Sequence, residues 1–226
     1  MPDSMRLSQL MISRLCHDLI TPVGAVVSGF EVLNLAEPQE RENLIHIIQQ
    51  SAQTGSRRLA IYRAAFGYGS ADVLSDAQRL SALVEDFIQS CKLTLTWEHA
   101  LCQEDLVGEH DQLEWMRLFL NILILVCELA PFGGEVQIAL IHQRGDLSAS
   151  FTLKGNLVEL RPDIVSGLKG YLSEDGYTPR NILAHLAYLR ARELGASFDF
   201  NQQNREQFTF NLNGGRNLAF APTTLF

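Results

Sequence analysis

The chain has 226 residues, of which 46% are apolar and 19% charged, so it is long enough to bury a core as one large domain or two small ones. Its 26 acidic and 18 basic residues leave a formal charge of -8, which argues against nucleic acid or an anionic membrane surface as the main partner. Seven prolines and the lack of a low-complexity tract exclude collagen-like and wholly disordered chains.

Several features of the sequence favour a cytoplasmic protein. The N-terminus carries acidic and polar residues throughout and so differs from a signal peptide. The longest apolar run, 122–127, is far too short to span a bilayer, and we expect no transmembrane helix. Four cysteines lie far apart without a CxxC pair, which favours reduced thiols over disulfides or a zinc site: Cys16, Cys91, Cys102 and Cys127.

The first seventy residues predict two long helices joined by a short turn. Apolar residues recur at steps of three and four through 12–33, which indicates a helix over about 4–36. Pro22 should bend this helix without ending it, because the apolar stripe continues in phase on both sides. After a turn at 37–38, a similar stripe over 44–66 indicates a second helix.

We expect this antiparallel hairpin, residues 1–70, to form a homodimer. A lone hairpin with arms of about thirty residues buries its apolar stripe poorly. Two hairpins paired as a four-helix bundle would cover that stripe, so the sequence predicts a dimeric four-helix bundle.

Residues 71–226 predict a second domain of mixed helices and strands. Helices are expected over 76–90, 111–129 and 179–195, the last with Pro179 at its first position and Gly195 at its end. Strands are expected over 92–98, 135–141, 147–153, 197–200 and 207–212, with a long loop over 155–178. The predicted fold class is therefore α+β: a helical hairpin followed by a sheet with helices packed on one face.

The candidate functional site is the segment Cys16-His17-Asp18-Leu19-Ile20-Thr21-Pro22. At about 100° per residue His17 points away from the apolar stripe. Its neighbours on the outer face are all small: Ser13, Thr21, Gly24 and Ser28. Imidazole is a competent nucleophile near neutral pH, and Asp18 could accept the other ring proton or hold the tautomer. A surface histidine without a function is the alternative that periodicity alone leaves open.

The segment from His17 to Pro22 resembles the phosphoacceptor motif H-[DE]-x-x-[TN]-P of two-component histidine kinases. Over essentially the whole chain, the hairpin and the following domain resemble the ChpT-type histidine phosphotransferases. The resemblance implies that His17 is phosphorylated in a phosphorelay, with receiver domains of a hybrid histidine kinase and of response regulators as partners. It also implies that the second domain is a degenerate ATPase-like α/β sandwich.

The second domain departs from the ATP-binding motifs of such kinases. Asn121 matches the first asparagine of the kinase N-box, but Leu125 stands where the magnesium ligand should be and offers no oxygen. The first glycine motif is replaced around 153–156 and the second has one glycine over 176–181, which removes the backbone cradle for phosphates. We expect no ATP, cofactor or metal on this chain, with Mg2+ supplied by the partner receiver. Asn121 would then cap or bridge within the core.

Without ATP, His17 must take its phosphoryl group from a receiver aspartate and pass it to a second receiver. In-line attack needs positive charge around the phosphoryl oxygens. Counting from a turn near Glu37 places Arg57 and Arg58 opposite His17, so one of the two should face the phosphoryl group, unless both form a solvated basic face. Thr21 stands where related kinases hold Thr or Asn to orient water for dephosphorylation.

Two other functions stay open: a histidine autokinase that retains ATP binding, and a non-catalytic dimeric adaptor that docks receivers. The charge distribution bears on where a receiver would dock. Residues 1–70 contain six acids and six bases, so the whole charge of -8 lies in 71–226. Receivers present an acidic pocket, and the neutral hairpin with its arginines suits such a pocket better than the acidic domain does.

Overall fold

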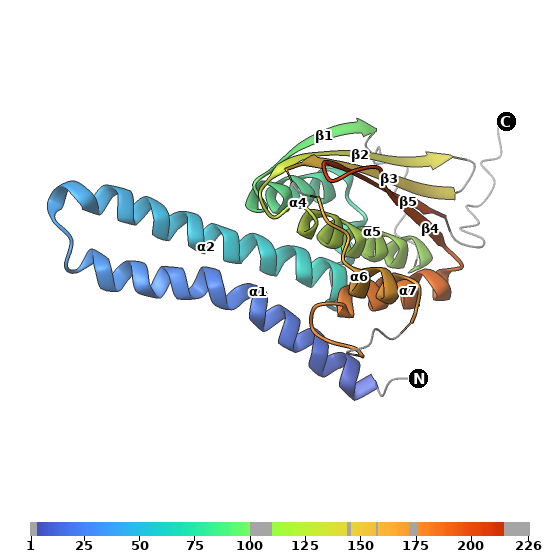
Figure 1. Ribbon diagram of the computed structural model, residues 1–226, viewed down its shortest axis with the longest axis horizontal. Coiled ribbons are helices and arrows are strands. Elements are labelled where there is room, and N and C mark those ends of the chain that lie inside the picture. Colours follow the sequence, from blue (N-terminus) through green and yellow to red (C-terminus); the bar gives the residue numbers. More distant parts are fainter. Residues whose placement is uncertain (1–3, 100–109, 144–145, 157, 172–175, 215–226) are drawn as a thin grey trace.

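The computed structural model describes residues 4–99, 110–143, 146–156, 158–171 and 176–214. The helices are α1 (Ser4–Leu33), α2 (Pro38–Phe66), α3 (Ala71–Leu74), α4 (Ala77–Ser90), α5 (His110–Glu128), α6 (Pro162–Leu168) and α7 (Ile182–Leu194). The strands are β1 (Leu93–His99), β2 (Gly134–Gln143), β3 (Asp146–Gly155), β4 (Ser197–Gln202) and β5 (Gln207–Asn213). Figure 1 shows α1 and α2 side by side, projecting beyond the sheet and the shorter helices. The predicted α+β architecture is confirmed.

Small residues fix the register of the helical hairpin. A Cβ atom added to Gly29 would lie 2.5 Å from Cγ1 of Ile48, so the two helices meet closely at this level. Nearer the base of the hairpin, a Cβ atom added to Gly55 would lie 3.6 Å from the ring of Pro22. The helix runs through Pro22 without interruption, as the phase of its stripe predicts, and Figure 1 shows α1 bending along its length.

Part of the apolar stripe predicted for α1 faces solvent in the single chain. Ile12 is 61% exposed, Val23 57% and Phe30 54%, while Leu15, Leu19 and Val26 are half-buried. By length and composition alone, α1 is long and apolar enough to cross a membrane. A helix that packs in a soluble protein can meet the same criteria. The expectation of no transmembrane helix therefore stays a prediction.

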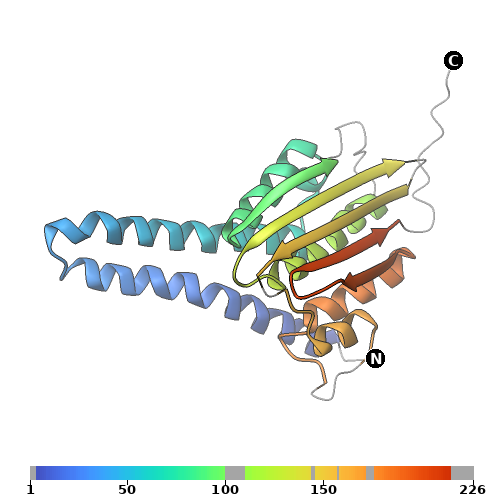
Figure 2. The ribbon, with the colours of Figure 1, turned by 45° about the horizontal axis from the view of Figure 1, so that its top comes forward.

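The second part is a five-stranded sheet with helices on one face. The strand order is β1-β2-β3-β5-β4, with β1 parallel to β2 and the other neighbours antiparallel. Figure 2 shows the strands in front and the helices α4, α5 and α7 behind them. The core between the layers contains Trp115, Phe119, Phe151 and Phe210, each at most 2% exposed. The predicted one-sided arrangement is confirmed.

Two of the differences from the sequence-based expectations lie between β3 and the last helix. The loop expected over 155–178 contains the helix α6, which Pro162 begins. The last helix begins at Ile182, so Pro179 lies in the turn before it and not at its first position. Asn181 stabilises that turn: its side chain accepts from the Thr178 backbone N at 2.9 Å and donates to the Gly176 carbonyl at 3.0 Å.

The base of the hairpin is part of the main core. Ile61, Tyr62, Ala64 and Ala65 of α2 belong to the same cluster of buried side chains as the sheet and its helices. The end of α2 is also capped from the second part, because Arg190 on α7 donates to the Ala65 carbonyl at 3.0 Å. This packing places the segment around His17 beside the second domain, whose predicted boundary at residue 70 stays a prediction.

Candidate functional site

His17 lies on the exposed face of α1. Its side chain is 78% exposed, and the four small residues that surround it are all exposed: Ser13, Thr21, Gly24 and Ser28. A Cβ atom on Gly24 would meet nothing within 4 Å. The imidazole is therefore open to a large partner, as the helical periodicity predicts.

The neighbouring Asp18 is buried and fixes one nitrogen of the imidazole. Nδ1 of His17 lies 3.1 Å from Oδ1 of Asp18, whose side chain is only 10% exposed. A carboxylate can only accept hydrogen bonds, so this pairing requires the proton on Nδ1. In the neutral ring the lone pair then lies on Nε2, the nitrogen that does not contact Asp18.

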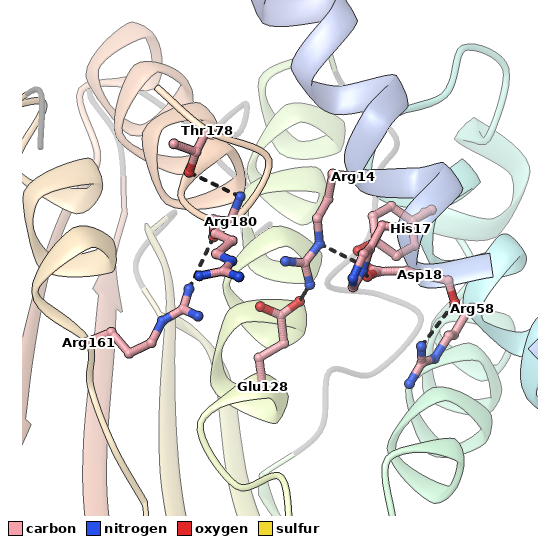
Figure 3. A network of polar contacts seen from close by, with 9 residues as sticks. Arg14, His17, Asp18, Arg58, Glu128, Arg161, Thr178 and Arg180 are labelled. Carbon is pink, nitrogen blue, oxygen red and sulfur yellow. Dashed lines mark hydrogen bonds and ion pairs between the residues drawn. The ribbon is translucent and has the colours of Figure 1, made fainter. Parts of the chain in front are cut away.

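Three side chains hold Asp18 in turn. Arg14, one turn earlier on α1, donates from Nε to Oδ2 at 2.9 Å, and the hydroxyl of Tyr62 donates to the same oxygen. Arg58 donates to the Asp18 carbonyl at 3.0 Å, as Figure 3 shows. Burial and the negative charge of Asp18 raise the pKa of Tyr62, so its phenol stays protonated and remains a donor.

An ion pair connects this cluster to the second domain. Arg14 also donates to Oε1 of Glu128 in the last turn of α5 (Figure 3). Burial lowers the pKa of Arg14, but the negative charges of Glu128 and Asp18 outweigh it and the net shift is upward, so the guanidinium stays charged. Burial raises the pKa of Glu128 to about 7, against the opposing effect of Arg14, although 31% of this side chain remains exposed.

A cleft of about 620 Å³ lies beside Asp18, between the hairpin and the second domain. Its charged lining residues are Arg14, Asp18, Arg58, Lys92, Glu128, Glu159 and Arg161. Figure 3 shows Arg161 across from Glu128, on the far side of Arg14 from His17. Four basic side chains thus gather in a cleft that borders the segment around His17.

The two candidate arginines of α2 have different surroundings. Arg58 lines the cleft and contacts Asp18, whereas Arg57 pairs with Asp86 of α4 at 3.3 Å. Adjacent residues on a helix point about 100° apart, so only one of them can face the cleft. Of the pair, the structure places Arg58 near His17 and turns Arg57 toward α4.

Comparison with known proteins gives the family. The family described as histidine phosphotransferase C-terminal domain matches residues 77–206. Over 190 residues, 84% of this chain and 87% of the relative, the sequence is 30% identical to the protein phosphotransferase ChpT of Brucella abortus (strain 2308). The chain belongs to the histidine phosphotransferase family. The resemblance to the ChpT-type histidine phosphotransferases, first indicated by the motif at His17, is confirmed.

The fold of one solved phosphotransferase agrees with this assignment. A bacterial phosphotransferase superposes with a TM-score of 0.77 at 26% identity, over 94% of this chain and 98% of that one. The histidine kinase domain from the Erythrobacter litoralis EL346 blue-light activated histidine kinase aligns at 12% identity and a TM-score of 0.41, over 85% and 95% of the two chains.

In this phosphotransferase, the two N-box positions have different surroundings. Asn121 is fully buried, and neither amide atom has a hydrogen-bond partner in the part of the chain that the structure describes, so the expected cap or bridge is not seen. Leu125 is 5% exposed and contributes to the cleft wall. Among the described residues, no group of three or more His, Cys, Asp or Glu side chains could hold a metal ion.

Four residues of the site were missed by the sequence reasoning: Arg14, Tyr62, Glu128 and Arg161. Arg14 could have been found, because it precedes Asp18 by four residues, the spacing of an ion pair on one helix. Tyr62 lies one turn beyond Arg58 on the same helix. Glu128 and Arg161 lie far from His17 in the sequence, and no regular spacing connects either residue with it.

Proposed function

We propose that this phosphotransferase shuttles a phosphoryl group between the aspartates of two receiver domains through His17. Membership of the family supports the transfer chemistry. The relay through His17 is supported by one observation above all: Asp18 holds Nδ1 while Nε2 lies on a side chain that is 78% exposed. A buried orienting carboxylate beside an open nucleophile is the arrangement that group transfer requires.

The chemistry follows from this arrangement. Nε2 of His17 attacks the phosphorus of the receiver's acyl phosphate in line, and the bond from phosphorus to the aspartate oxygen breaks. The receiver regains its carboxylate, and the phosphoryl group is then bonded to Nε2. Asp18 stabilises the positive charge that forms on the ring by accepting from Nδ1–H. In the second half, the carboxylate of another receiver attacks the same phosphorus, and the N–P bond breaks.

Basic side chains complete the site. Arg58 is held at the level of Asp18 and lines the cleft, so it is the arginine we assign to the phosphoryl oxygens. Further positive charge comes from Mg2+ carried by the receiver. Thr21 is exposed one turn after His17, where its hydroxyl can orient a water molecule for dephosphorylation.

We propose that the second domain acts without ATP. Leu125, which offers no oxygen to a metal, forms part of the cleft wall, and Glu128 on the same helix holds Arg14. The domain then has a positioning role: it anchors the cluster around Asp18 and presents Arg161 to the cleft.

We also propose that the protein is a cytoplasmic homodimer. Ile20, Val23, Val27 and Phe30 recur at steps of three and four, and each is between 54% and 70% exposed in the single chain. At about 100° per residue this exposed apolar stripe lies beside the face of α1 that packs on α2. A second hairpin laid against it would form a four-helix bundle and leave His17 accessible.

A transfer assay tests the proposed function. The purified protein is mixed with a receiver domain phosphorylated beforehand and freed of kinase and ATP. We expect an acid-labile phosphate on this chain within seconds to minutes, and its passage to a second unphosphorylated receiver. His17→Ala should abolish the labelling while dimerisation is retained.

The same assay separates the rival functions. A non-catalytic adaptor would bind the phosphorylated receiver but acquire no phosphate. An autokinase would label His17 when incubated with labelled ATP and Mg2+ alone, an outcome that contradicts our proposal. Phosphate acquired from the receiver but not from ATP supports it.

A further inference from the structure

Two cysteines from distant segments meet in the wall of the cleft. Cys91 directly follows α4, and Cys127 lies in the last turn of α5. Both line the cleft, and each thiol shifts the pKa of the other. The third described cysteine, Cys16, is exposed on α1 and does not line the cleft. Two thiols close together in the wall of one cleft can form a disulfide.

The backbone holds Cys91 in this position. The next residue, Lys92, has a positive φ of 60°, unusual for a residue with a side chain. The Lys92 carbonyl also approaches Gly133 so closely that a Cβ atom there would lie 2.7 Å from it. The turn between α4 and β1 is therefore fixed against the turn before β2, and this holds Cys91 in the wall of the cleft.

The two thiols differ in accessibility and in acidity. Cys91 is half-buried, whereas Cys127 is 5% exposed. The hydrogen bond from Cys127 lowers the pKa of Cys91, helped by Ser90 and Arg58 and opposed by burial. The same hydrogen bond and burial raise the pKa of Cys127. Cys91 is therefore the thiol that an oxidant in the cleft would reach and oxidise first.

We propose that Cys91 and Cys127 form an oxidation site, at which a peroxide converts the two thiols to a disulfide that slows phosphotransfer at His17. In the first step the Cys91 sulfur attacks hydrogen peroxide, the O–O bond breaks, and Cys91 sulfenic acid and one water form. The Cys127 sulfur then attacks the Cys91 sulfur and expels a second water. Two thiols are oxidised by two electrons, and the peroxide is reduced to two waters. A dithiol reductant reverses the reaction by thiol–disulfide exchange.

The effect on phosphotransfer rests on the proposed function and follows from the neighbours of the two cysteines. Cys127 immediately precedes Glu128, which holds Arg14 and through it Asp18. A covalent bond from Cys127 to Cys91 draws the end of α5 toward the end of α4, along the wall of the cleft. A shift of this kind at an orienting carboxylate changes the geometry of attack, so we expect transfer to slow by roughly tenfold.

Oxidation of the purified protein with hydrogen peroxide tests the site directly. Peptide mapping without reduction should yield a Cys91–Cys127 linked peptide, lighter by two hydrogens than the sum of its parts and lost on reduction with dithiothreitol. A sulfinic acid at Cys91 without the link, or a link that involves Cys16 instead, overturns the assignment. This readout does not depend on phosphotransfer, so it decides the oxidation site even if the proposed relay fails.

Transfer from a phosphorylated receiver is then compared before oxidation, after it, and after reduction. The oxidised wild-type protein should be slower by roughly tenfold and should recover with dithiothreitol. Cys91→Ser should transfer at the rate of the wild-type protein with reduced thiols, and peroxide should not slow it. Cys127→Ala tests the same expectation at the other thiol. Cys16→Ser, the matched control, should respond to peroxide like the wild type. A linked protein that transfers at the unoxidised rate overturns the regulatory effect.

Discussion

Tyr62 on α2 donates a hydrogen bond to Asp18, the residue that follows His17 on α1. Tyr62 is 4% exposed and belongs to the main core, so its hydroxyl cannot move without repacking that core. Arg14 adds a second hydrogen bond to the same carboxylate oxygen at 2.9 Å. The exposed nucleophile is thus oriented by a carboxylate that the buried interior holds in place.

The first prediction concerns this hydrogen bond. In Tyr62→Phe the ring still fills its place, but Asp18 loses one donor in a buried site. We expect the free energy of unfolding to fall by about 1 to 3 kcal/mol and transfer to His17 to slow. Urea unfolding and single-turnover transfer from a phosphorylated receiver measure the two effects. Phe66→Leu, a change in a ring that packs on Tyr62 at 5.9 Å, is the control, with stability lowered but transfer retained.

The second prediction concerns the charge of Asp18. Asp18→Asn keeps the size of the side chain but removes the carboxylate that fixes the proton on Nδ1 of His17. We expect transfer in single turnover to slow by roughly a hundredfold, within the usual range for loss of an acid–base partner. Asp72→Asn removes an exposed carboxylate that pairs with Arg79 and should leave the rate unchanged. A rate for Asp18→Asn within twofold of the wild type would contradict the orienting role.

Local patterns predicted the fold and part of the site. The apolar periodicity gave both long helices, and the small residues around His17 indicated its exposure, because both properties depend on which face of one helix a residue occupies. Counting residues from the turn near Glu37 placed Arg57 and Arg58 opposite His17, because both helices of the hairpin rise by the same distance per residue. The contact of Arg58 with Asp18 agrees with that count. Within the second domain, the sequence pattern located all five strands between the predicted helices and turns.

The remaining parts of the site depend on contacts between distant segments. Glu128 meets Arg14 across 114 positions of sequence, and the residues between them contain no spacing that relates the two. Arg161 directly precedes α6, a helix that the sequence did not predict. This helix has only seven residues, and the proline at its start is equally typical of a loop. Such contacts are set by how the hairpin packs on the second domain.

The third prediction separates the two arginines of α2. Arg58→Ala removes a positive charge from the cleft and the donor to the Asp18 carbonyl, so transfer should slow by at least about tenfold. Arg57→Ala breaks only a partly exposed pair with Asp86 and should stay within about twofold of the wild-type rate. Single-turnover transfer from the same phosphorylated receiver measures both. Equal losses in the two variants would show that the basic face acts as a whole.

The fourth prediction concerns the dependence of stability on pH. Burial raises the pKa of Glu128 from its ordinary value of 4.5 to about 7, so between these values the folded protein holds this proton more tightly than the unfolded chain. The free energy of unfolding should therefore fall as the pH rises through this window. Because 31% of the side chain is exposed, we expect a change of about 1 kcal/mol, less than a fully buried carboxyl would give.

Glu128→Gln removes this titration. Urea unfolding at pH 5, 6, 7 and 8 should give a flatter profile for the variant than for the wild type, with the largest divergence between pH 5 and 7. Glu85→Gln, a change at an exposed carboxyl of α4, should leave the wild-type profile as it is. Parallel profiles for Glu128→Gln and the wild type would contradict the raised pKa.

The fifth prediction concerns the exposed apolar stripe of α1. Val27 is 55% exposed in the single chain and becomes buried if two hairpins pair. Val27→Glu places a carboxylate in that interface, where it has no partner, so the dimer should dissociate to monomers at micromolar concentrations. Sedimentation equilibrium of the wild type and the variant measures the change in association.

The control adds the same charge away from this stripe. Gln78→Glu changes an exposed residue of α4 and should leave the oligomeric state unchanged. Circular dichroism should show that Val27→Glu keeps its helices, because the valine is exposed within one chain and its replacement removes little packing there. A wild-type protein that sediments as a monomer at every concentration would rule out the bundle. If the Val27→Glu variant remains dimeric, the interface lies on another face of the hairpin.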